Sequence, residues 1–137
     1  MNRDYPEIIE LSKQLSNVRI HFGLTDLSRV YRLSDLAIFA AGITLYELAS
    51  YGVPSIAYSM VDNQIHTAEA FDKIGISINI GASCQPQFFS NMFSAVHNLI
   101  NNHLLRKRMS DRAIILIDGY GALRIADCII EGKGKNV

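Results

Sequence analysis

The chain has 137 residues, 49% of them hydrophobic and 19% charged, which suits one folded domain and excludes a disordered composition. Thirteen basic and thirteen acidic side chains cancel, so the chain lacks the basic excess that nucleic-acid-binding proteins usually carry. The short basic run Arg106–Arg108 is interpreted as the solvated face of a helix.

Cysteine usage and hydropathy favour a cytoplasmic protein. Cys84 and Cys128 belong to no CxxC pair and have no histidine at metal-ligand spacing, so we expect reduced thiols and neither a metal nor another cofactor. The most apolar segment, Leu36–Ala49, is too short for a membrane span and contains the charged Glu47. The beginning of the chain, Met1–Glu10, lacks the apolar stretch of a signal peptide.

Hydrophobic periodicity predicts the elements in chain order. The first part is expected to form a helix, a short strand and a second helix, over Tyr5–Leu15, Val18–Phe22 and Thr25–Leu33. Two continuous apolar runs predict strands buried on both faces, and an alternating run predicts a further strand: Asp35–Ala41, Pro54–Tyr58 and Ile76–Ile80. Between these strands, helices are expected over Thr44–Tyr51, with Gly52 as its C-cap, and over Gln64–Ile74.

Three further helices are expected in series over Gln87–Asn101, His103–Ile117 and Ala122–Ile130. Strands that alternate with helices through short glycine turns indicate an α/β fold with a parallel sheet. We therefore predict a partial Rossmann-like domain over residues 1–132, with about four parallel strands flanked by helices and a helical C-terminal end. Residues 133–137 are expected to form a flexible tail.

Ligands of an open parallel sheet bind at the carboxyl ends of its strands. Three turns fall at such ends, Phe22–Thr25, Ala41–Thr44 and Ser59–Gln64, and they are expected to lie side by side. In the middle turn, Gly42 would let the backbone adopt positive φ and approach a ligand, and the free N–H groups of the following helix would attract a phosphate. The alternative is a strand–glycine–helix turn without any ligand.

Glu47 allows two interpretations. Thr44-Leu45-Tyr46-Glu47 fits a capping box, in which Thr44 caps the helix and Glu47 reaches back to its backbone N–H. A carboxylate can also accept two hydroxyl groups at once, so Glu47 could instead bind a ribose. Spacing alone favours the capping box.

Polar side chains follow the next strand. Asn63 and Gln64 carry amides that suit sugar hydroxyls and N-acetyl groups, although Asp62 or Asn63 could simply cap the helix. His66, just after Gln64, could face the same cleft. The sequence shows no Ser–His–Asp order, nucleophile elbow or P-loop, so no catalytic residue is assigned.

The run S-D-L-A-I-F-A-A-G-I-T-L-Y-E-L-A-S-Y-G-V-P-S-I-A-Y, then D-N-Q, M-S and D-G-Y-G-A-L-R-I, resembles the carboxy-terminal domain of the UDP-sugar hydrolases of pseudaminic acid biosynthesis. These enzymes are related to the peptidoglycan GlcNAc transferases of glycosyltransferase family 28, which also have the GT-B fold. The resemblance covers about a hundred residues in ordered blocks.

This resemblance implies a UDP-sugar site. Gly42, Ile43 and Thr44 would hold the diphosphate, and Glu47 would bind the ribose. Asn63, Gln64 and His66 would face the sugar, and Gly23 and Leu24 would border the uracil. These site residues are Gly23, Leu24, Gly42, Ile43, Thr44, Glu47, Asn63, Gln64 and His66.

Two residues depart from the family's G-G-S-T turn, which reads Ala41-Gly42-Ile43-Thr44 here. Ala41 adds a Cβ that restricts φ, and Ile43 replaces a hydroxyl that could donate to phosphate. Both changes are expected to lower the affinity for the diphosphate.

The related enzymes place their catalytic histidine in an amino-terminal domain that this chain is expected to lack. The resemblance thus implies a nucleotide-sugar-binding half, truncated at its start and inactive without a catalytic partner chain. The alternatives are the donor-binding subunit of a two-chain GlcNAc transferase and a non-catalytic interaction module. An exposed sheet edge would also favour self-association.

Overall fold

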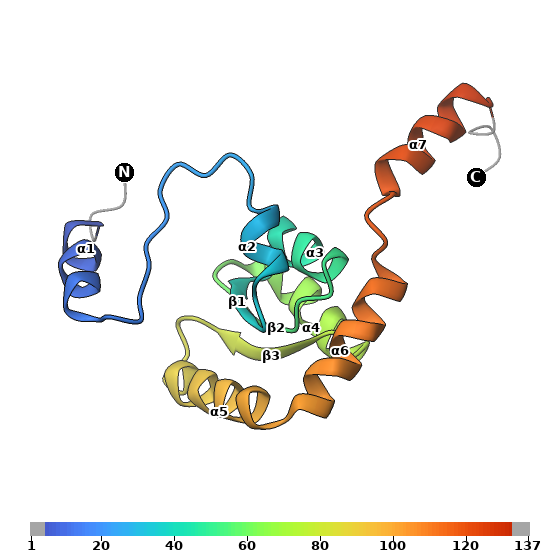
Figure 1. Ribbon diagram of the computed structural model, residues 1–137. Helices are drawn as coiled ribbons and strands as arrows, with labels where there is room; N and C mark the ends of the chain where they lie inside the picture. The colour runs from blue at the N-terminus through green and yellow to red at the C-terminus, as the bar shows by residue number, and fades with distance from the viewer. Residues whose placement is uncertain (1–4, 133–137) are drawn as a thin grey trace.

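The computed structural model describes residues 5–132, so the tail predicted over 133–137 lies outside the described residues (Figure 1). The first half contains α1 (Tyr5–Gln14), α2 (Ser28–Arg32), β1 (Ala37–Ala40), α3 (Ile43–Ser50) and β2 (Ser55–Ser59). The second half contains the 3-10 helix η1 (Asp62–Gln64), α4 (Ile65–Lys73), β3 (Ser77–Ala82), α5 (Phe88–Asn101), α6 (His103–Leu116) and α7 (Gly121–Ile130). The predicted α/β class and the helical C-terminal end are confirmed.

The three strands form one parallel sheet in the order β1-β2-β3. Ile56 and Ala57 on the central strand β2 are both fully buried, and they belong to core clusters on opposite faces of the sheet. A strand that is covered on both faces reads as a continuous apolar run, which is the pattern that predicted β2. Because parallel strands need crossover connections, α3 and α4 lie between them in the sequence.

Helices cover both faces of the sheet (Figure 1). α3 and α4 pack on one face, where Leu45 and Phe71 share a core cluster with Ala57 of β2. α5 packs on the other face, beside β3, and buries Leu99 against Ile56. The core is therefore centred on β2, and α3 begins just after the carboxyl end of β1.

A fourth strand was predicted over Val18–Phe22, and this prediction is wrong. The segment is irregular, and Val18 and Phe22 are 41% and 48% exposed. Alternating side chains do not make a strand unless its backbone pairs with a neighbour, and this segment runs away from the sheet (Figure 1). As a consequence β1 is an edge strand, so Ile38 is 38% exposed instead of buried as predicted.

α2 is also shorter than the helix predicted over Thr25–Leu33. Asp26 accounts for its late start, because its carboxylate accepts hydrogen bonds from the backbone and side chain of Ser28 at 2.8 and 2.9 Å. Such local bonds compete with helical bonds and favour a turn. The helix that remains carries Tyr31, whose side chain is buried.

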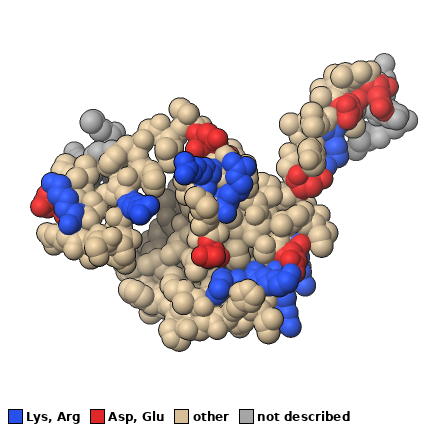
Figure 2. Space-filling view, in the orientation of Figure 1, with Lys and Arg blue, Asp and Glu red and all other residues tan. Residues whose placement is uncertain are grey.

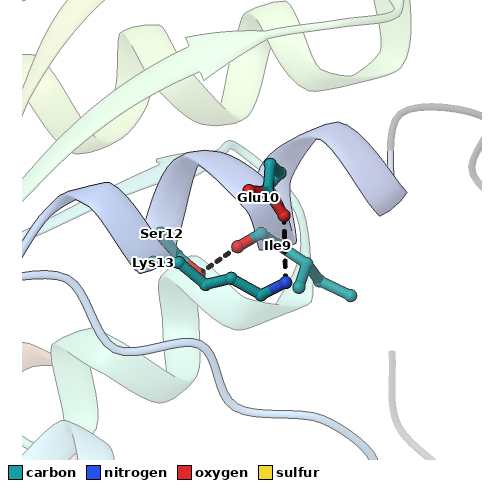
Figure 3. Close-up of polar contacts among 4 residues, drawn as sticks. All are labelled: Ile9, Glu10, Ser12 and Lys13. Carbon is teal, nitrogen blue, oxygen red and sulfur yellow. Dashed lines mark hydrogen bonds and ion pairs between the residues drawn. The ribbon is translucent and has the colours of Figure 1, made fainter.

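The first and last helices stand apart from the sheet (Figure 1). α1 is held by local contacts: Ser12 Oγ donates to the carbonyl of Ile9 at 2.7 Å, and Lys13 pairs with Glu10 at 2.9 Å (Figure 3). Every residue of α7 is exposed, including its apolar side chains. None of the described helices is long and apolar enough to cross a membrane bilayer.

On the face shown in Figure 2, acidic and basic side chains occur side by side in several places, and basic side chains gather over α6 with an acidic group beside them. In the basic run on α6, Lys107 and Arg108 are exposed as predicted, and Lys107 pairs with Asp111 at 2.6 Å. Arg106 instead folds back and donates to main-chain carbonyls at the end of α5. Its guanidinium thus helps to hold the junction between α5 and α6.

Candidate functional site

The candidate site lies where β1 and β2 end, because the carboxyl ends of parallel strands meet at one edge of the sheet. The turn after β1 leads into α3 and the turn after β2 leads into η1. A Cβ built on Gly42 would lie 3.8 Å from the side-chain nitrogen Nε2 of Gln64. The predicted adjacency of these two turns is therefore confirmed.

The start of α3 leaves backbone donors open. Gly42 is the N-cap residue and no side chain caps the helix. The N–H of Leu45 donates to the carbonyl of Gly42 at 3.1 Å, whereas the N–H groups of Ile43 and Thr44 find no acceptor among the described residues. Together with the positive end of the helix dipole, these N–H groups can hold an anion.

Gly42 does not adopt the positive φ that was predicted for it. Its φ is −103° and its ψ is −159°, which is extended backbone. None of the described residues other than glycine has positive φ, so Ala41 fits its conformation without strain and buries its Cβ in the core. The restriction of φ by the Cβ of Ala41 therefore causes no backbone strain here, whereas Ile43 is 80% exposed and presents an alkyl group beside the helix start.

The capping box predicted from Thr44 and Glu47 is wrong. Gly42 occupies the N-cap position, so Thr44 lies two residues too late in the sequence to cap the helix. The carboxylate of Glu47 instead accepts a hydrogen bond from the hydroxyl of Tyr31 on α2, with 2.9 Å between Oε2 and Oη. Tyr31 is only 5% exposed. Burial of the side chain is the larger cause and the hydrogen bond to Glu47 the next, and together they raise the pKa of Tyr31 to about 12.

This pair lies beside a surface cavity of about 360 Å³ between α2 and α3. The cavity is lined by Leu24, Thr25, Asp26, Leu27, Ser28, Tyr31, Glu47, Ser50 and Tyr51. Leu24 therefore lines the same cavity as Glu47. Gly23 is not among the lining residues. Its φ of +61° shapes the irregular segment that carries Leu24.

The amide of Gln64 lies at the second turn. Its oxygen Oε1 accepts a hydrogen bond from the backbone N–H of Met60 at 2.8 Å, which directs the NH₂ group towards Gly42. Neither Asp62 nor Asn63 caps η1 or α4 with its side chain, so the capping alternative is wrong. Asn63 is exposed at the surface of this turn.

His66 does not join these residues. Its imidazole is 93% exposed and lies 3.8 Å from the carboxylate of Glu69, on the same helix. The structure therefore places Gln64 beside Gly42 and brings Leu24 and Glu47 to one cavity, and it leaves His66 at the surface.

No pattern in the sequence pointed to Tyr31 as a residue of the site. It lies sixteen positions before Glu47, on a helix with no recognisable motif, and only the packing of α2 against α3 brings the two side chains together. A buried tyrosine usually has a partner for its hydroxyl, but that rule does not say which residue the partner is.

The motif D-G-Y-G-A-L-R has a structural role in the turn between α6 and α7. Asp118 accepts hydrogen bonds from the backbone N–H of Tyr120 at 3.0 Å and from Arg124 at 2.6 Å. The hydrogen bond from Arg124 holds the pKa of the Asp118 carboxyl below its ordinary value. The turn also lines a second cavity, of about 410 Å³, on the other side of Glu47 and Ser50.

No protein-family model matches the chain. It is 29% identical over 101 residues to the spore coat polysaccharide biosynthesis protein SpsG of Bacillus subtilis, covering 73% of this chain and 29% of that protein. It is 38% identical over 80 residues to the UDP-N-acetylglucosamine–N-acetylmuramyl-(pentapeptide) pyrophosphoryl-undecaprenol N-acetylglucosamine transferase of Finegoldia magna, covering 54% of this chain and 22% of that enzyme.

The chain thus spans less than a third of the length of either curated relative. The two similarities support the relationship to glycosyltransferases of the GT-B type that the motifs predicted. They do not single out the hydrolases of pseudaminic acid biosynthesis.

Proposed function

We propose that the chain binds a UDP-sugar and forms the donor-binding half of a GT-B-type enzyme. The observation that carries the proposal is the arrangement along α3. Its open N-terminus lies beside the amide of Gln64, and Glu47, one turn further along, borders the cavity. Along α3 the backbone N–H donors come first and the carboxylate of Glu47 second, which matches the order of the diphosphate and the ribose in a UDP-sugar.

In the proposed complex, the N–H groups of Ile43 and Thr44 bind the diphosphate. Gly42 leaves room for it, because a Cβ at that position would reach into the space next to Gln64. Glu47 accepts the ribose hydroxyls, Leu24 lies against the uracil, and the amides of Asn63 and Gln64 face the sugar. Gly23 contributes indirectly, because its backbone conformation positions Leu24. His66 contacts a sugar only if the start of α4 changes its conformation.

The reaction is either hydrolysis of a UDP-linked amino sugar, with release of UDP, or transfer of the sugar to an acceptor. The name of the Finegoldia magna relative specifies transfer of N-acetylglucosamine, which favours an N-acetylamino sugar as the donor. The catalytic group is proposed to come from an amino-terminal-type domain, and the half-site alone is proposed to be inactive. The two exposed, unpaired cysteines are consistent with a cytoplasmic location.

Titration with UDP tests the binding. We expect NMR shift changes centred on Gly42, Glu47 and Gln64, and a weaker response to uridine, which lacks the diphosphate. Glu47→Gln should weaken the binding, whereas Asp111→Asn should not, because Asp111 lies at the opposite end of the strands with Lys107. Unchanged spectra at millimolar UDP would contradict the proposal.

A donor-binding subunit of a two-chain enzyme is the second candidate. It is favoured by α7, where Leu123 and Ile129 are 60% and 75% exposed and offer an apolar face to a partner. Co-expression with a separately encoded catalytic domain should then yield a stable complex that turns over a UDP-sugar. If the two chains elute separately in size-exclusion chromatography, this candidate is wrong.

A further inference from the structure

Among the residues that the structure describes, Tyr31 and Glu47 form the one hydrogen bond between side chains of α2 and α3. Tyr31 Oη donates to Glu47 Oε2 at 2.9 Å. The second carboxylate oxygen, Oε1, accepts no hydrogen bond from the described residues. Both residues line the cavity of about 360 Å³.

The tyrosine is the fixed member of this pair. Its ring packs in a buried cluster with Ala37, Leu48 and Val53, and its centroid lies 5.6 Å from that of Tyr51. Glu47 is an exposed residue. Without the hydroxyl of Tyr31, an exposed glutamate would sample several rotamers, because nothing else in the described chain holds its carboxylate.

We infer that Tyr31 is a positioning residue that orients the Glu47 carboxylate towards a ribose and makes the site prefer a ribonucleotide to a 2′-deoxyribonucleotide. The inference rests on the proposed function. An ionised carboxylate has about four acceptor positions, and Tyr31 occupies one. The remaining positions can accept the 2′- and 3′-hydroxyls together only while the carboxylate keeps one orientation.

This pre-organisation has a measurable consequence. A ligand that finds Glu47 already oriented does not have to immobilise it, so removing the Tyr31 hydroxyl should lower the affinity for UDP by about three- to tenfold. A 2′-deoxy ligand leaves one acceptor position unused, so wild-type protein should bind UDP about tenfold or more tightly than 2′-deoxy-UDP.

Calorimetric titrations with UDP and 2′-deoxy-UDP test the inference on the wild-type chain, Tyr31→Phe, Glu47→Ala and the double variant. We expect Tyr31→Phe to weaken UDP binding and to reduce the preference for UDP over its 2′-deoxy analogue. In the Glu47→Ala background the same substitution should have no further effect, because Tyr31 acts through Glu47. Tyr58→Phe is the matched control, since Tyr58 packs on Phe88 in the core cluster on the other face of the sheet.

A merely structural role of Tyr31 would leave the ratio of the two affinities unchanged. Equal binding of UDP and 2′-deoxy-UDP by the wild-type chain, or an unchanged ratio in Tyr31→Phe, overturns the inference while leaving UDP binding in place. If Tyr31→Phe does not fold, Glu47→Asp replaces it, because the shorter side chain keeps the charge but withdraws from the hydroxyl. A preference retained in Glu47→Asp also overturns the inference. Absence of any UDP binding by the wild-type chain refutes the proposed function itself, and the inference with it.

Discussion

The side-chain oxygen of Gln64 accepts a hydrogen bond from the backbone N–H of Met60 at 2.8 Å, and this bond directs the amide nitrogen towards Gly42. The turn after β2 thereby places a fixed donor beside the start of α3. A donor held in this way is pre-organised for an anionic or hydroxyl-bearing ligand.

Replacing Gln64 by glutamate tests this role. The carboxylate can still accept from Met60, but it substitutes a negative charge for the donor that faces Gly42. We expect UDP affinity to fall by a factor of about ten or more, corresponding to a lost hydrogen bond to a charged group. The free energy of unfolding should change little, which urea denaturation will check. Asn98→Asp, on the exposed side of α5, provides the matched control.

Gly42→Ala and Gly52→Ala are expected to have opposite consequences. A Cβ at Gly42 meets only ordinary contacts, so stability should be kept while UDP binding weakens. Gly52 ends α3 with a φ of +68°, and a Cβ there would lie 2.7 Å from Ile114 Cδ1. We expect Gly52→Ala to lower the free energy of unfolding by about 2–4 kcal/mol. Gly121→Ala, with no atom near its Cβ, serves as the neutral control for both.

Thr44→Ala distinguishes the structure from the capping box. Because Gly42 and not Thr44 is the N-cap residue, the substitution should change the free energy of unfolding by less than about 0.5 kcal/mol. Asn102 is a real side-chain cap, since its Oδ1 accepts from the N–H of Leu105 at 3.0 Å. Asn102→Ala should therefore cost about 1 kcal/mol in a urea denaturation experiment. A similar loss in Thr44→Ala would show that Thr44 caps the helix after all.

Tyr31 should make stability depend on pH in the alkaline range. Burial and the bond to Glu47 raise its pKa to about 12, above the value of about 10 for a solvated phenol. Below pH 10 the hydroxyl is protonated in both states and its contribution is complete. Between pH 10 and 12 the unfolded chain releases the proton first, so stability falls as the pH rises. The loss of stability between pH 9 and 11.5 should be smaller in Tyr31→Phe than in wild type.

We also expect the chain to self-associate. β1 is an edge strand whose outer backbone groups pair with no other described strand, and Ile125 and Ile130 of α7 are 64% and 82% exposed. Sedimentation velocity should show an average mass that increases with protein concentration. Replacing Ile125 and Ile130 by lysine should reduce the association if α7 takes part. A monomer mass at every concentration would contradict the prediction.

The sequence by itself determined the α/β class, β2 and its position in the core, and the adjacency of the turns that contain Gly42 and Gln64. These features follow from local signals: continuous apolar runs predict buried parallel strands, and parallel strands bring their carboxyl ends together. In α5 the residues that face the sheet follow helical spacing: Leu99 is buried, and Met92 and Val96 pack against the same core cluster.

Tertiary structure decided the rest. Alternation over Val18–Phe22 could not show that its backbone lacks a pairing partner. The capping box placed the N-cap at Thr44 and could not show that it lies two residues earlier, at Gly42. The partner of Glu47 depended on the packing of α2 against α3, which no local pattern encodes. A carboxylate on the fifth residue of a helix has several possible partners, and only the fold selected Tyr31.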